Sequence, residues 1–121
     1  MNSTELVDRY CQAWSEPDAA RRSELLRSVW GAGATYTDPL VHAEGAEELL
    51  AHIAKIQLSR PGARVLRTTA VDSHHGHARF GFHVVLPHGA IIREGIDIAL
   101  MSPDGKRIER IVGFFGPLET A

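Results

Sequence analysis

Cysteine and long apolar runs are nearly absent from the sequence. Cys11 is the only cysteine among 121 residues, so no internal disulfide and no cysteine-based zinc site can form. We therefore expect a protein of the reducing cytoplasm. No apolar stretch approaches the roughly 20 residues of a membrane-spanning helix, and residues 1–5 lack the features of a secretory signal. These absences predict a chain without a membrane partner.

An excess of basic residues is also missing. The sequence has 13 Lys and Arg residues against 15 Asp and Glu residues, which gives a formal net charge of −2. A nucleic-acid-binding protein normally carries a basic surplus or a basic stripe, so we expect no nucleic-acid partner. The hydrophobic fraction of 44% is typical of a folded globular chain. The length predicts one domain over residues 1–121.

Helical periodicity dominates the first part of the sequence. Asn2 and Glu5 match a helix-capping box, and apolar side chains recur at helical spacing over the residues that follow. A second helix is predicted with Pro17 in its first turn, where a missing N–H group costs nothing. Its apolar stripe is expected to include Trp30, and Gly31 is expected to end it.

Little regular structure is predicted between the second and third helices. Residues 34–37 form a short β-like run that ends at Asp38 and Pro39, and a loop is expected from there to Gly45. A third helix then carries apolar residues at helical spacing. The Arg-Pro-Gly sequence at residues 60–62 is expected to terminate it.

The second half of the sequence has the composition of β-strands. Four segments are rich in β-branched and aromatic residues, namely 63–72, 78–86, 90–102 and 107–115. Turn-forming clusters separate them, so we expect hairpins and an antiparallel sheet. Three helices followed by such a sheet predict an α+β fold.

Both faces of this sheet are apolar. In segment 90–102, Asp97 and Ala99 share one face, whereas Ile96 and Ile98 lie on the other. Only one face can pack on the three helices. The second apolar face therefore predicts a covering partner, most simply a second copy of the chain in a homodimer.

Asp38, Asp97 and Tyr10 are the candidates for chemistry. Asp38 precedes a proline and either caps a turn or, beside an apolar pocket, acts as a general base. Asp97 interrupts an apolar strand, which requires an exposed face, pairing with Arg93, or a functional acid kept neutral by burial. Tyr10 lies on the apolar stripe of the first helix, either as a core residue or as a donor to an oxyanion.

Three histidines, His74, His75 and His77, crowd one predicted hairpin turn. Imidazoles at this spacing could chelate a metal ion. Apart from Asp72, however, no carboxylate or cysteine supports them, which favours a solvated turn. We therefore expect no metal, and no motif for an organic cofactor is present.

The order of these elements resembles the nuclear transport factor 2-like superfamily, and within it the SnoaL-like and ketosteroid isomerase branch. The motifs that carry the resemblance are Tyr-Thr-Asp-Pro at residues 36–39 and the closing strand Arg-Ile-Val-Gly-Phe-Phe-Gly at residues 110–116. The resemblance covers nearly the whole chain. It implies a cone in which a curved antiparallel sheet wraps around three helices and encloses an apolar cavity.

The resemblance also implies roles for individual residues. Asp38 matches the general base of the isomerases, Asp97 the protonated acid of their oxyanion hole, and Tyr10 its tyrosine donor. A carboxylic acid kept neutral at pH 7 is the known device of ketosteroid isomerase itself. At the position of Ile53 some isomerases carry a group that supports the oxyanion tyrosine, which an isoleucine cannot do. The expected pocket wall comprises Trp14, Trp30, Ile53, Phe80, Phe82, Val84 and Phe115.

Three functions are open at this point, because one such cone hosts many activities. An isomerase or cyclase would bind a hydrophobic carbonyl compound, steroid-like or polyketide-like, remove a proton with Asp38 and stabilise the enolate. A binding module would hold an apolar ligand without chemistry. An epoxide hydrolase or cyclase would use Asp38, Asp97 and Arg93. An arginine between the two carboxylates would favour the last, whereas Tyr10 reaching Asp97 would favour the first.

Overall fold

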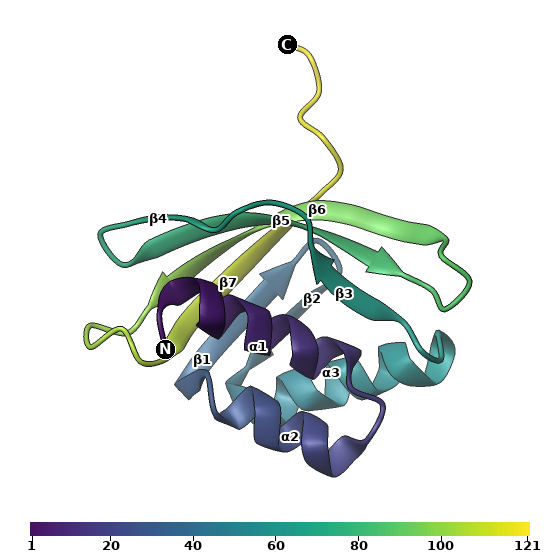
Figure 1. The fold of residues 1–121 in the computed structure, drawn as a ribbon, viewed down its shortest axis with the longest axis horizontal. Coiled ribbons are helices and arrows are strands. Elements are labelled where there is room, and N and C mark those ends of the chain that lie inside the picture. The colour runs from purple at the N-terminus through teal and green to yellow at the C-terminus, as the bar shows by residue number, and fades with distance from the viewer.

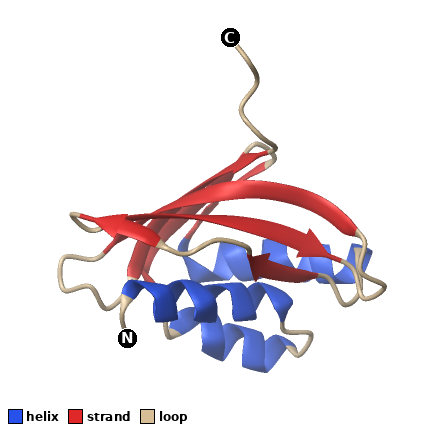
Figure 2. Ribbon diagram, turned by 45° about the horizontal axis from the view of Figure 1, so that its top comes forward, coloured by secondary structure: helices blue, strands red, loops and turns tan.

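Three helices lie against the concave side of one curved sheet in the computed structural model, which describes all residues 1–121 (Figure 1). The helices are α1 (Ser3–Ser15), α2 (Ala19–Arg27) and α3 (Gly45–Ser59). The strands are β1 (Trp30–Asp38), β2 (Val41–Glu44), β3 (Arg64–Arg67), β4 (Asp72–His74), β5 (His77–Val85), β6 (Ile91–Met101) and β7 (Ile108–Phe115). Figure 2 shows the strands arching over the helix layer, which confirms the predicted α+β fold. None of the helices is both long and apolar enough to cross a membrane.

The sheet is largely antiparallel, but it contains one parallel pair that its sequence does not predict. The strand order is β2-β1-β7-β6-β5-β3, and β4 also pairs with β5. β1 and β7 run parallel because the chain passes through α3 and the intervening strands before it returns beside β1. The other strand pairs are antiparallel.

The second helix begins and ends at other residues than predicted. Asp18 rather than Pro17 marks its start, because the Asp18 carboxylate accepts a hydrogen bond of 2.9 Å from the backbone N–H of Arg21. At the other end, Trp30 and Gly31 begin β1 instead of completing the helix. The cause is a long-range contact, since the carbonyl of residue 29 accepts a hydrogen bond of 2.7 Å from the backbone N–H of residue 108 next to it in the sheet.

Two further segments differ from prediction. Residues 41–44, expected in a loop, form β2, in which Val41 lies opposite Asp38 of β1. The predicted strand 63–72 is divided into β3 and β4. It breaks because the N–H of Gly81 donates to the Thr69 side-chain hydroxyl at 2.9 Å instead of to a strand carbonyl.

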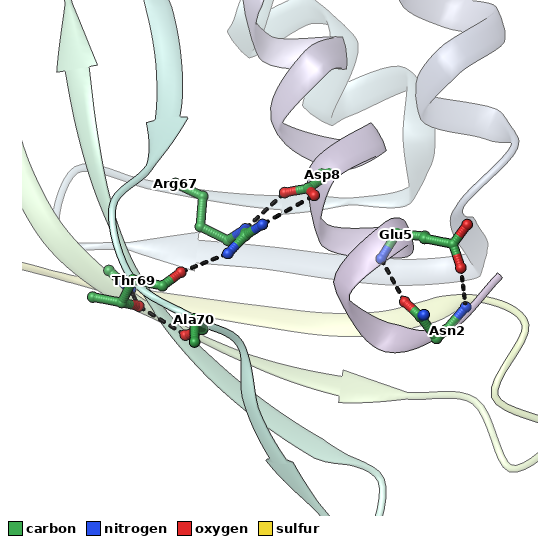
Figure 3. Close-up of polar contacts among 7 residues, drawn as sticks. Asn2, Glu5, Asp8, Arg67, Thr69 and Ala70 are labelled. Carbon is green, nitrogen blue, oxygen red and sulfur yellow. Dashed lines mark hydrogen bonds and ion pairs between the residues drawn. The ribbon is translucent and has the colours of Figure 1, made fainter.

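Two sets of polar contacts fix α1, one at its own N-terminus and one to the sheet (Figure 3). The predicted capping box is confirmed, since the Asn2 side chain and the Glu5 carboxylate each accept from the other's backbone N–H, at 2.9 and 3.1 Å. Farther along the helix, Arg67 of β3 donates to both carboxylate oxygens of Asp8 at 2.7 and 3.1 Å. This two-point ion pair fastens the edge of the sheet to α1 and fixes one wall of the interior.

The core lies between the helices and the inner face of the sheet. Wholly buried aliphatic side chains come from all three helices and from β7, among them Leu6, Leu26, Leu49, Ile53 and Ile111. The outer face of β6 and β7 is different, because Ile96, Ile98 and Phe114 are 47%, 43% and 56% exposed there. The inner face of the sheet is therefore buried and the outer face exposed, as the alternation of side chains along the predicted strands indicates.

Candidate active site

A mainly apolar cavity lies between α1, α3 and the inner face of the sheet. Its volume is about 270 Å³, and 10 of its 16 lining residues are hydrophobic, so a ligand would be held mostly by apolar contacts. Small-molecule sites commonly measure about 300–1,000 Å³, which places this cavity at the small end of the range. Asp38, Asp97 and Tyr10 all line it. The structure therefore brings the three predicted chemical groups together in one cavity.

Asp38 is held in a fixed orientation by three donors. Its Oδ1 atom accepts hydrogen bonds from the backbone N–H groups of Leu40 and Val41 at 2.8 and 3.1 Å, so the residue does cap the turn after β1. Its Oδ2 atom accepts a 2.6 Å hydrogen bond from the Tyr36 hydroxyl. A carboxylate has about four lone-pair positions. One position on Oδ2 is therefore left for a ligand, and turn-capping and a chemical role are compatible.

Asp97 is buried without a partner for one of its oxygens. The residue is 4% exposed, and Oδ1 makes no hydrogen bond. Burial raises the pKa of the carboxyl group from 3.8 to about 7, and the negative charge of Asp38 adds to this effect. At neutral pH, Asp97 therefore exists to a large extent as a carboxylic acid that can donate a hydrogen bond.

The side chains of Asp97, Asp38 and Tyr36 all lie close to Gly113. A Cβ atom at Gly113 would lie 2.7 Å from Asp97 Oδ1, 3.5 Å from the Asp38 Cβ and 3.8 Å from the Tyr36 hydroxyl oxygen. Glycine is required here because any side chain would collide with Asp97.

Tyr10 is wholly buried and stacks on Trp30 with 5.7 Å between ring centroids. No hydrogen bond joins it to Asp97. Burial raises the pKa of its hydroxyl well above 10, and the nearby charge of Asp97 raises it further, so Tyr10 stays protonated. Its neighbour Cys11 is buried as well, and burial raises the pKa of this thiol to about 12, which makes it unreactive.

The cavity residues that sequence reasoning missed include Tyr36 and His52. Tyr36 lies two residues before Asp38 and so on the same face of β1, a signal the sequence did contain. His52 of α3 packs edge-on against Trp14 and stacks on Tyr36, at centroid distances of 5.7 and 6.4 Å. Burial lowers the pKa of His52 below its ordinary value, although the charge of Asp38 opposes this. The imidazole is therefore mainly neutral at pH 7.

The predicted pocket wall divides into two groups. Trp14, Phe82, Val84 and Phe115 line the cavity. Trp30, Ile53 and Phe80 do not, and placing them on the pocket wall is wrong: they are 5%, 0% and 2% exposed and belong to the core behind it. Trp30 lies in the core because it begins β1, where its ring stacks on that of Tyr10. Ile53 lies on the face of α3 that packs into the core, one residue from His52.

Arg93 makes no ion pair with Asp97 or Asp38. Its guanidinium carbon lies over the Phe115 ring, 4.1 Å from the centroid. The arginine therefore does not lie between the two carboxylates, which is the arrangement that would favour epoxide chemistry. No cation neutralises Asp97, so burial and the negative charge of Asp38 both favour its protonated form.

The histidine turn lies outside this cavity. His74, His75 and His77 are exposed, and the Nδ1 atoms of His74 and His75 lie 3.2 Å apart. No group of three or more His, Cys, Asp or Glu side chains is arranged to hold a metal ion. The turn is a solvated hairpin tip, as the sequence favours.

Comparison with known proteins finds relatives among solved structures alone: no protein-family model matches the sequence, and no curated protein matches it. The chain is similar to a SnoaL-like family protein from Agrobacterium tumefaciens C58, provisionally named an isomerase, with 30% identity and a TM-score of 0.86 over 93% of this chain and 96% of that one. A nuclear transport factor 2-like protein of unknown function from Exiguobacterium sp. 255-15 has 17% identity and a TM-score of 0.69, covering 93% and 99% of the two chains. A Catenulispora acidiphila DSM 44928 protein with a ketosteroid isomerase-like fold, solved with trimethylamine, has 14% identity and a TM-score of 0.69 over 96% and 88%. At such identities the last two show the fold alone.

We predict that Asp97→Asn stabilises the protein at pH 8 but hardly changes its stability at pH 4. Because the pKa of Asp97 is about 7 when folded and near 3.8 when unfolded, the wild type loses stability as pH rises between these values. At about 1.4 kcal/mol per pKa unit, the full loss is about 4 kcal/mol, which a neutral amide avoids. Urea unfolding at both pH values measures the difference, with exposed Glu47→Gln as the control. An Asp97→Asn protein that gains nothing at pH 8 would contradict a buried, unpartnered carboxyl group.

Proposed function

Because the chain belongs to the SnoaL-like family and has the nuclear transport factor 2-like fold, we propose that it is an enzyme that moves a proton on a hydrophobic carbonyl compound. The observation that supports this most directly is the pair of carboxyl groups that line one cavity in different environments. One is fixed by three donors with a lone pair left free, and the other is buried, unpartnered and neutral to a large extent. Two carboxyl groups whose environments differ in this way suit a base and an acid.

Asp38 is the proposed general base. Its free lone pair on Oδ2 takes a proton from the carbon next to the substrate carbonyl, and the electron pair of that C–H bond moves onto the carbonyl oxygen to give an enolate. The Tyr36 hydroxyl and two backbone N–H groups keep the carboxylate in place while this happens. A pre-oriented base needs no reorganisation during the reaction.

Asp97 is the proposed acid that stabilises the enolate. In its protonated form it donates a hydrogen bond to the developing oxyanion, which gives the orphaned carboxyl group a partner in the transition state. Tyr10, which is protonated and lines the same cavity, is the proposed second donor. The apolar lining excludes water, which strengthens both hydrogen bonds.

The fate of the enolate decides the reaction. Return of the proton from Asp38 to another carbon gives a double-bond isomerisation. Attack of the enolate carbon on a second carbonyl instead gives an aldol-type ring closure, in which the alkoxide formed takes up the proton from Asp38. Both reactions need only the residues named above. The volume of about 270 Å³ favours a compound of modest size, and the trimethylamine held by the Catenulispora protein is an example of a small molecule bound by a protein of this fold. No observation favours epoxide opening, since Arg93 stands apart from both acids.

We predict that Asp38→Asn abolishes exchange of the α-protons of a bicyclic ketone such as 1-tetralone in D₂O. The wild type exchanges these protons faster than buffer because Asp38 removes them, and loss of a general base lowers such rates by about 10²- to 10⁴-fold. Proton NMR follows the loss of the α-proton signal, with Glu47→Gln as a charge-matched control. Circular dichroism checks that the variant is folded.

Two outcomes would contradict this proposal. Exchange by Asp38→Asn at the wild-type rate would exclude Asp38 as the base. A wild-type protein that binds the ketone without accelerating exchange would identify a binding module instead of an enzyme.

The apolar outer face of the sheet is the proposed interface of a homodimer. Ile96 of β6 pairs with Phe114 of β7, and Ile98 lies beside them on the same face. All three are at least two-fifths exposed in the single chain. Contiguous apolar side chains at the centre of a sheet are costly to leave in water, and a second copy would cover them.

We predict that the wild type elutes as a dimer, with twice the monomer mass of 13.3 kDa. Phe114→Lys places a charge in the proposed interface and should yield monomers, whereas Leu58→Lys, an exposed apolar position on α3, should not. Light scattering coupled to gel filtration measures both. A wild-type monomer, or a Phe114→Lys dimer, would contradict the proposed interface.

A further inference from the structure

Two arginines that line the cavity have no assigned role and no carboxylate partner. Arg60, just beyond α3, and Arg93, near the start of β6, both line the cavity. Neither takes part in an ion pair, whereas Arg67 and Arg79 each bind a carboxylate. The acidic residues of the lining are Asp38 and Asp97 alone. The cavity therefore has an acidic end and a cationic end.

Distances along the two walls show how far apart these ends lie. On α3, His52, Ile56 and Arg60 follow one another at intervals of four residues and all line the cavity, and eight residues of helix span about 12 Å. On β6, Arg93 and Asp97 share one face, and four residues of strand span about 13 Å. His52 stacks on Tyr36, which donates to Asp38, so it marks the acidic end. The α3 wall and the β6 wall thus give nearly the same distance between the acidic end and the cationic end.

The folded chain places both arginines on the same side of the molecule. The end of α3 and the hairpin between β5 and β6 project in the same direction in Figures 1 and 2. The Phe115 ring supports the flat face of the Arg93 guanidinium at 4.1 Å. Stacking of this kind leaves the N–H edges of the guanidinium free, and these edges match the two oxygens of a carboxylate.

We propose that the substrate is a hydrophobic carbonyl compound that also carries a carboxylate, which Arg60 and Arg93 bind at the mouth of the cavity. This inference rests on the proposed function, because the carbonyl then lies beside Asp38 and Asp97 at the other end. The apolar body between the two groups contacts Ile56, Phe115 and the neighbouring wall. Two interactions select this orientation, since the arginines attract the anion and the Asp38 carboxylate at the inner end repels it.

A rigid rod with a ketone at one end and a carboxylate at the other tests this pose. The probe is 4′-acetylbiphenyl-4-carboxylate, and its neutral control is the corresponding primary amide, which has nearly the same shape. Isothermal titration calorimetry gives the dissociation constant of each compound for the wild type, for the Arg60→Gln/Arg93→Gln double variant, and for Arg64→Gln. Arg64 is an exposed arginine on β3 outside the cavity lining. It controls for the general effect of removing positive charge.

The wild type and Arg64→Gln should bind the carboxylate about tenfold more tightly than the amide, a preference set by partly solvated charge-assisted hydrogen bonds. The double variant should lose this preference, while its affinity for the amide stays unchanged. Equal affinity of the wild type for both compounds, or a preference that persists in the double variant, would overturn the proposal and leave the proposed function intact. Failure of the wild type to bind either compound would overturn both, because the cavity would then not accept the ketone.

Discussion

The buried carboxyl group of Asp97 is the constraint on which the rest of the cavity depends. A carboxylic acid removed from water, with one oxygen unpartnered, is tolerated only if it keeps its proton or has a cation nearby. Here Arg93 stacks on Phe115, and the charge that acts on Asp97 is that of Asp38, which is also negative. Glycine at position 113 leaves room for the Asp97 carboxyl group, and both acids line the same cavity. The buried carboxyl group of Asp97 therefore destabilises the folded protein when it is ionised, and protonation reduces this destabilisation.

The surrounding architecture keeps this arrangement rigid. The ion pair between Arg67 and Asp8 ties the sheet edge to α1, which carries Tyr10 and Trp14 into the cavity. The turn after β1 supplies the two N–H groups that fix Asp38. Asp38 is therefore fixed by residues close to it in the sequence, whereas the position of Tyr10 depends on packing between elements distant in the sequence. The resulting gradient, from two acids at one end to two arginines at the other, gives a bound molecule a defined direction.

Much of this architecture is visible in the sequence, and the rest depends on long-range contacts. Asp97 is conspicuous because a charged residue interrupts an apolar strand, and Asp38 because it ends an extended run. Trp30 was expected in a helix because its local periodicity is helical, but pairing with β7 draws it into β1. His52 was missed because apolar neighbours on α3 dominate its pattern, and only the three-dimensional packing turns its ring toward Tyr36. Tyr36 could have been found, since it shares a strand face with Asp38.

The most direct test of this account is the titration of Asp97 itself. Carbon-13 NMR of the side-chain carboxyl, assigned by comparison with Asp97→Asn, gives its pKa in the folded protein. We expect a midpoint at about 7, and a lower one in Asp38→Asn, where the charge of Asp38 no longer opposes ionisation. A midpoint near 4 in the wild type would show that Asp97 is ionised at neutral pH. It could then not serve as the hydrogen-bond donor to an enolate, and the proposed chemistry would be wrong.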